Sequence, residues 1–144
     1  MLDRAAIQGL IPHQGAMCLL ETVLAWTQDD IACRGRSHLA PDNPLRRGGR
    51  LSAMAGIEYG LQAAALHGAL RSQAPLPPGW LAALRGVTLH VTHLDDPTLG
   101  QLQVAAQLIH GDAGAMIYDF ALRAEDTRLL VDGRATIALQ RPAA

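Results

Sequence analysis

Hydrophobic positions follow two patterns along this chain of 144 residues, and each pattern predicts a different element. Between residues 51 and 70 they are nearly continuous; this stretch is rich in Ala and Leu, has no proline, and includes Glu58, Gln62 and His67. At a rise of about 1.5 Å per residue it predicts a helix about 30 Å long. Because apolar or small residues occupy nearly every face of that helix, we expect protein to surround it.

The rest of the chain carries shorter apolar segments separated by turn residues. Residues 17–25 and 31–36 predict two strands, and the polar residues 27–30 between them favour a hairpin. Two prolines and two glycines in residues 38–50 predict a loop, and the prolines of residues 72–79 predict a stiff crossover. Four further strand-like segments follow the helix, at residues 80–93, 102–110, 115–124 and 129–139.

The order of these elements predicts the fold class. Asp3 can cap a short helix that runs to Leu10, and it is followed by two strands, the long buried helix and about four antiparallel strands. Strands segregated from one central helix indicate an α+β protein. A single sheet that buries an apolar helix must curl around it, which is the hotdog fold. With no internal repeat, we expect residues 1–144 to form one domain.

Composition narrows the class of protein further. A hydrophobic fraction of 49% suits a filled core, and a net charge of −1 argues against a general nucleic-acid binder. Cys18 and Cys33 have no zinc-site spacing and are too few for a disulfide scaffold, which favours a reduced, cytoplasmic protein. No signal peptide is recognisable at the N-terminus. Glu58 lies within the longest apolar stretch, which argues against a membrane span.

No sequence motif predicts a metal ion or an organic cofactor. His90 and His93 have the spacing of a metal-binding pair, but on a strand they point to opposite faces. Phosphate-binding loops, nucleophile elbows and dinucleotide fingerprints do not occur in the sequence. We therefore expect chemistry that uses side chains alone.

Glu58 is the most informative candidate for that chemistry. It is the only charged residue in the predicted helix, where an unpaired carboxylate costs several kcal/mol or stays protonated. Gln62 follows one turn later on the same stripe, and the small side chains of Ala55 and Ala65 leave room for a ligand. Glu58 is either an active-site acid or a structural ion-pair partner of an arginine.

Among the histidines, His38 is the candidate base. It opens the loop that enters the predicted helix, where a base would have to lie. His67 is about 13 Å from Glu58 along the helix, too far to share one substrate carbon. We expect His13 to hold the N-terminal segment in place.

Several motifs resemble those of the 3-hydroxyacyl-acyl carrier protein dehydratases. Residues 57–64 (IEYGLQAA) are similar to the central-helix motif of that family. Residues 11–23 (IPHQGAMCLLETV) resemble its N-terminal segment and first strand, and residues 131–133 (VDG) its penultimate turn. Residues 37–46 (SHLAPDNPLR) are similar to the predicted dehydratases of aryl-polyene-type biosynthetic clusters.

This resemblance implies roles for three residues. Glu58 would be the acid that protonates the departing 3-hydroxyl, His38 the base that takes the C2 proton, and Gln62 would orient the Glu58 carboxyl. The protein would be a homodimer or higher oligomer, with His38 and Glu58 of one site in different subunits. The main family places its histidine in a His-Phe-Pro-Gly loop, whereas His38 precedes Leu-Ala-Pro and a longer loop.

The loop before the helix is a candidate substrate-binding element. Arg46, Arg47 and Arg50 could bind the phosphopantetheine phosphate and the acidic surface of acyl carrier protein. Backbone N–H groups at Gly48 and Gly49 could approach the thioester carbonyl. The alternative is a solvated loop.

These observations favour a dehydratase that converts a 3-hydroxyacyl thioester on acyl carrier protein to a trans-2-enoyl thioester, in fatty-acid-like or polyene biosynthesis. A second dehydratase or a ketosynthase is a possible partner subunit. Two alternatives stay open: a hotdog acyl thioesterase, and a non-catalytic acyl-carrier-binding partner of another dehydratase.

Overall fold

The computed structural model describes residues 1–74 and 79–139. Its helices are α1 (Arg4–Gln8) and α2 (Gly56–Ser72), with the short 3₁₀ turns η1 (Gly15–Met17), η2 (Ser37–Leu39), η3 (Ala53–Ala55) and η4 (Pro97–Leu99). Its strands are β1 (Thr22–Trp26), β2 (Asp30–Gly35), β3 (Gly79–Leu89), β4 (Leu102–Gly111), β5 (Ala115–Arg123) and β6 (Leu129–Leu139). Residues 75–78 of the predicted crossover at residues 72–79 lie outside the described residues.

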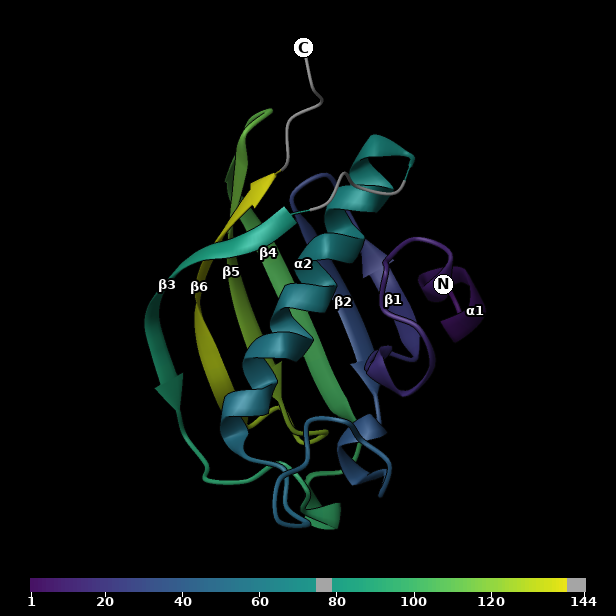
Figure 1. Cartoon of the computed structure of the whole chain (residues 1–144), viewed down its shortest axis with the longest axis vertical. Coiled ribbons are helices and arrows are strands. Elements are labelled where there is room, and N and C mark those ends of the chain that lie inside the picture. Colours follow the sequence, from purple (N-terminus) through teal and green to yellow (C-terminus); the bar gives the residue numbers. More distant parts are fainter. Residues whose placement is uncertain (75–78, 140–144) are drawn as a thin grey trace.

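The six strands form one antiparallel sheet in the order β1-β2-β4-β5-β6-β3. The sheet curves around α2, which lies along its concave side (Figure 1). Alternate residues of β5 are buried, and this periodicity of two turns Met116, Tyr118, Phe120 and Leu122 toward the core. The α+β hotdog fold predicted from the element order is confirmed.

Glycines allow α2 to pack directly on the sheet. A Cβ atom at Gly60 would lie 2.5 Å from the ring of Phe120, and one at Gly56 would lie 3.0 Å from the side chain of Val131. The buried residues of α2 occupy nearly all of its circumference, as the continuous apolar pattern predicted. Gly60 thus sets the depth of the helix in the curled sheet.

The helix begins later than residue 51, and the first strand begins later than residue 17. Ser52 caps η3 by accepting a hydrogen bond from the N–H of Met54, and the α-helical geometry starts at Gly56. The segment before Thr22 makes a 3₁₀ turn instead of continuing β1. Periodicity in the sequence did not reveal these boundaries because each depends on a local hydrogen bond.

None of the helices in the described part of the chain combines the length and apolar character needed to cross a membrane.

Candidate active site

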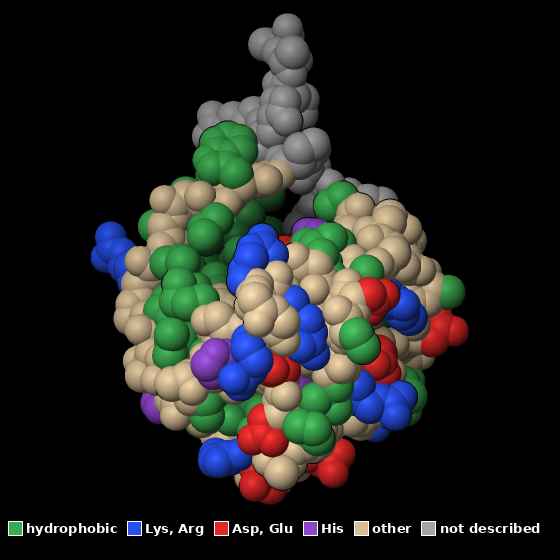
Figure 2. Space-filling model, turned by 60° about the horizontal axis from the view of Figure 1, so that its bottom comes forward, with side chains coloured by type: hydrophobic (Ala, Val, Ile, Leu, Met, Phe, Trp, Pro, Cys, Tyr) green, Lys and Arg blue, Asp and Glu red, His purple; other side chains and the backbone are tan. Residues whose placement is uncertain are grey.

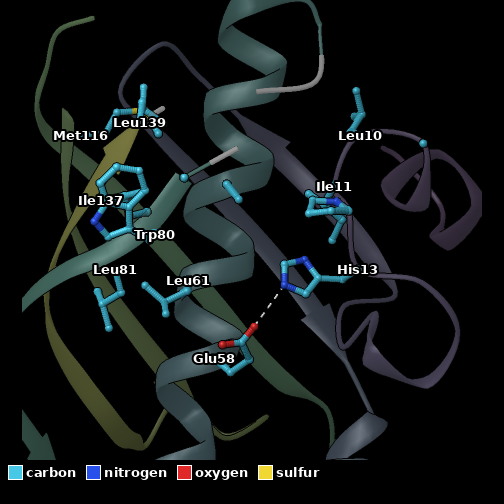
Figure 3. A pocket seen from close by; sticks show the side chains of 14 residues that line it. Leu10, Ile11, His13, Glu58, Leu61, Trp80, Leu81, Met116, Ile137 and Leu139 are labelled. Atoms are coloured by element: carbon cyan, nitrogen blue, oxygen red, sulfur yellow. Dashed lines mark ion pairs between the residues drawn. The ribbon is translucent and has the colours of Figure 1, made fainter. Parts of the chain in front are cut away.

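A cavity of about 480 Å³ lies between α2, the N-terminal segment and the adjoining ends of three strands (Figure 3). Most of its lining is apolar. The lining side chains shown in Figure 3 include Leu10, Ile11, His13, Glu58, Leu61, Trp80, Leu81, Met116, Ile137 and Leu139. Such a lining suits an aliphatic or conjugated chain.

Glu58 and His13 form the polar end of this cavity. The Nε2 atom of His13 lies 3.2 Å from Oε1 of Glu58, and the two side chains point toward each other (Figure 3). Their side chains are 27% and 30% exposed, so both are open on the cavity side. The Nδ1 atom of His13 is buried and has no hydrogen-bond partner among the described residues. Sequence analysis expected His13 only to anchor its segment; the pairing with Glu58 was missed.

Gln62 holds the N-terminal segment against α2. Its side-chain nitrogen donates to the carbonyl of Met17 at 2.7 Å, and its oxygen accepts from the N–H of Leu19 at 3.0 Å. Arg4 adds hydrogen bonds to the carbonyls of Gly15 and Cys18. The prediction that Gln62 orients the Glu58 carboxyl needs correction, because both ends of its amide are bonded to backbone. Gln62 instead binds the end of the segment that carries His13.

His38 lies apart from this centre. Its side chain is fully buried in η2, and neither ring nitrogen has a hydrogen-bond partner among the described residues. Burial lowers the pKa of His38, and the nearby backbone of Gly100, although it does not meet hydrogen-bond geometry, and the charge of Glu21 offset part of that shift. His38 does not line the cavity that contains Glu58. Within one chain His38 and Glu58 therefore do not share a cavity; their pairing across two subunits, as predicted, stays a prediction.

The arginines of the loop before α2 have different roles. Arg46 is largely internal: it donates to the carbonyls of Ala40 and Gly49 at 2.9 Å each. Arg50 is 58% exposed and binds Asp95 at 2.8 Å. Arg47 is exposed and donates only to nearby carbonyls of the same loop. Of the three, Arg47 and Arg50 remain accessible to a ligand.

Gly48 and Gly49 form the tip of that loop. Both have positive φ angles, of 59° and 75°, and the N–H of Arg47 donates to the carbonyl of Arg50 across the turn. Two successive residues with positive φ are typical of a tight hairpin turn that favours glycine. Neither glycine lines the cavity that contains Glu58. The turn therefore explains the glycine pair that was predicted to bind the thioester carbonyl.

Comparison with known proteins identifies the family. The profile of the ApeP-like family, described as ApeP dehydratase, matches residues 5–143. The chain belongs to this family. It is accordingly a dehydratase. No curated protein sequence matches it significantly.

Solved structures similar to this ApeP-like dehydratase share its fold. A chain of the dehydratase heterocomplex ApeI:P from Xenorhabdus doucetiae has a TM-score of 0.82 at 20% identity, over 94% of this chain and 91% of that one. AziG of S. sahachiroi has a TM-score of 0.62 at 14% identity, over 85% and 92% of the two chains. The thioesterase HI1161 from Haemophilus influenzae has a TM-score of 0.60 at 14% identity, over 83% and 76%.

One further buried histidine of this ApeP-like dehydratase is structural. His67 Nε2 lies 2.8 Å from the carbonyl of Thr27, and its Nδ1 lies 2.7 Å from the hydroxyl of Tyr118. Since a carbonyl only accepts, Nε2 carries the proton and Nδ1 accepts from Tyr118. Burial lowers the pKa of His67, which keeps the ring neutral. Both nitrogens are occupied, so His67 takes no part in chemistry at Glu58.

Proposed function

We propose that this dehydratase removes water from a 3-hydroxyacyl thioester carried on acyl carrier protein and produces a trans-2-enoyl thioester. The observation that carries the proposal is the position of the Glu58 carboxyl at the polar end of a mainly apolar cavity. An acyl tail in the apolar part would leave the oxygen-bearing carbons beside Glu58. The apolar lining would thus bind the acyl tail, and Glu58 would mark the reactive end of the cavity.

Glu58 would act as the general acid. The thioester makes the C2 hydrogen acidic, so a base can remove it while the C2–C3 double bond forms and the C3–O bond breaks. Glu58 in its protonated form then delivers a proton to the departing hydroxyl, which leaves as water. The atoms and electrons of this reaction balance without an oxidant, a metal or an organic cofactor.

Two exposed arginines support a carrier-linked substrate. Arg47 and Arg50 project from the loop that precedes α2. Figure 2 shows arginines gathered near the apolar surface on the face turned forward; the chain has no lysine, so every blue side chain there is an arginine. Such a surface is complementary to a phosphopantetheine phosphate and an acidic carrier. We assign the reaction to fatty-acid-like or polyene biosynthesis in the cytoplasm.

One of the two edges of the sheet, strand β3, supports a partner subunit. Strand β3 pairs with β6 on one side and, among the described residues, has no neighbouring strand on the other. Trp80, Leu81, Leu84 and Leu89 of this edge strand are all exposed, Trp80 to 58%. Natural proteins rarely leave such an edge uncovered. Because Trp80 and Leu81 also line the cavity, a subunit on this edge would close it.

That subunit would be a second copy of this chain or another dehydratase. The similar chain from Xenorhabdus doucetiae belongs to a structure described as the dehydratase heterocomplex ApeI:P. A ketosynthase is the remaining candidate partner. Size-exclusion chromatography with light scattering, on the chain alone and after mixing, would distinguish these assemblies.

A mass measurement tests the proposed reaction. The wild-type chain and Glu58→Gln are each incubated with a 3-hydroxyacyl group on acyl carrier protein, and the carrier-bound product is weighed. We expect the wild type to remove one water and leave the acyl group on the carrier, and Glu58→Gln to leave the substrate unchanged. Release of free acid and free carrier thiol would indicate a thioesterase. Binding without any change in mass would indicate a non-catalytic partner and overturn the proposal.

A further inference from the structure

We infer that His13, and not His38, is the second proton-transfer residue of the reaction, so that one chain supplies both the acid and the base. This inference rests on the proposed dehydration at Glu58. It places the complete acid–base pair on the N-terminal segment and the first turn of α2. A partner subunit would then enclose the substrate instead of contributing the base.

The geometry around His13 leaves one nitrogen available for chemistry. Nδ1 is buried and has no hydrogen-bond partner among residues 1–74 and 79–139. Nε2 lies 3.2 Å from Glu58 Oε1 at the polar end of the cavity (Figure 3). Proton exchange with a bound substrate would therefore take place through Nε2, and the proposed base is the neutral tautomer with its proton on Nδ1.

The proton balance assigns the roles within the pair. At the start the His13 ring is neutral, with Nε2 unprotonated, and Glu58 carries a proton. Nε2 accepts the C2 proton, the C–H electron pair forms the C2–C3 double bond, the C3–O bond breaks, and Glu58 gives its proton to the leaving hydroxyl. Enoyl thioester and water are formed, and His13 and Glu58 end as imidazolium and carboxylate. Transfer of one proton back across the 3.2 Å contact restores the starting pair.

The contacts of the His13 segment give the base a fixed position. Pro12 restricts the backbone before it, and Gln62 and Arg4 bind the carbonyls and N–H groups that follow it. His38 offers no such access, because its side chain is fully buried and does not line the cavity. A base enclosed in this way cannot receive a proton from a carbon held beside Glu58.

Single substitutions test the inference on a wild type that dehydrates the carrier-linked substrate. We expect His13→Gln to lower kcat by about 10²-fold or more, since general base catalysis is worth that much. The fall in rate at low pH that arises from protonation of the base should disappear at the same time. His38→Gln and the exposed-residue control His90→Gln should keep kcat within about 3-fold per folded molecule. Full activity of a folded His13→Gln, or loss of that fall in rate at low pH in His38→Gln, would overturn the inference, whereas an inactive wild type would refute the proposed function instead.

A mixing experiment tests whether one chain supplies both groups. His13→Gln and Glu58→Gln chains with different affinity tags are co-expressed, and complexes that carry both tags are purified. If acid and base came from different subunits, one site of such a complex would contain an intact His13 and an intact Glu58, and activity would return. We expect no return of activity; a doubly tagged complex that dehydrates the substrate would overturn the inference. Wild-type activity from a chain that forms no complex with itself would support it.

Discussion

The side-chain oxygen of Gln62 accepts a hydrogen bond of 3.0 Å from the backbone N–H of Leu19. The amide nitrogen of the same residue donates to the carbonyl of Met17 at 2.7 Å. Gln62 is fully buried on α2, one turn beyond Glu58. The helix that carries the acid therefore also holds the end of the segment that carries His13.

Replacing Gln62 with Leu should remove both hydrogen bonds and leave two backbone groups of the N-terminal segment unpaired. Each unpaired group costs about 1–3 kcal/mol, so we expect the free energy of unfolding to fall by about 2–4 kcal/mol. Turnover per folded molecule should also fall, because His13 would be less precisely placed. Urea unfolding and dehydration assays measure the two effects. The exposed Gln107→Leu is the control, and an equal loss in both variants would contradict the role of Gln62.

Glu58→Gln separates a catalytic carboxyl from a structural ion pair. The Glu58–His13 contact is partly exposed, so its loss should change the free energy of unfolding by no more than about 1 kcal/mol. Dehydration should fall by about 10²-fold or more. Thermal melting and product analysis give both values. A loss of about 3–5 kcal/mol with activity retained per folded molecule would mean that Glu58 is structural.

Gly60→Ala should lower stability through overpacking. Its added Cβ atom would lie 2.5 Å from the Phe120 ring, so the helix or the ring must shift. We expect a net cost of about 1–3 kcal/mol, although alanine favours the helix more than glycine does. Gly9→Ala is the matched control, since its Cβ atom would have no neighbour closer than 3.4 Å. A double variant with Phe120→Leu should recover part of the loss; equal stability of Gly60→Ala and wild type would contradict the close packing.

Stability should fall as the pH drops below about 6.5, the pKa of histidine in an unfolded chain. Burial lowers the pKa of both His67 and His38 in the folded protein. Below pH 6.5 the unfolded chain therefore binds more protons than the folded chain, and the free energy of unfolding decreases. Urea unfolding at pH 7.5 and about pH 5.5 should show the difference. His67→Gln should be less stable at both values yet less sensitive to pH; an unchanged pH dependence would exclude His67 as a cause.

Replacing Arg47 and Arg50 with Gln should weaken binding of carrier-linked substrates. We expect KM for the carrier-bound substrate to rise and its dependence on salt to decrease, with little change for a small thioester mimic. Arg46 is left in place because it is bonded to loop carbonyls. Arg36→Gln, another exposed arginine, is the control. Equal losses on carrier-bound substrate and mimic would show that these arginines maintain the loop or the cavity.

The sequence alone was sufficient to predict the hotdog fold and Glu58 as its candidate acid. The apolar stretch around Glu58 predicts a helix surrounded by protein. The alternating pattern of β5 predicts a strand with one buried face. The periodicity of apolar residues is a local property of the sequence, so these elements can be recognised without knowing their neighbours. The resemblance to dehydratases, read from the same helix, agrees with the ApeP-like family membership.

Only the tertiary structure decided which histidine lies beside Glu58. The order of residues favoured His38, because it opens the loop that leads into the helix. In the folded chain the side chain of His38 is fully buried, and the N-terminal segment, distant in sequence, brings His13 to 3.2 Å from the carboxyl. Gln62 was similarly predicted to orient Glu58, one turn away on the helix. Its amide instead binds the backbone of Met17 and Leu19, which are far away in sequence. A side chain's partner depends on how separate segments pack and on where buried backbone groups need hydrogen bonds, and neither is visible in local sequence patterns.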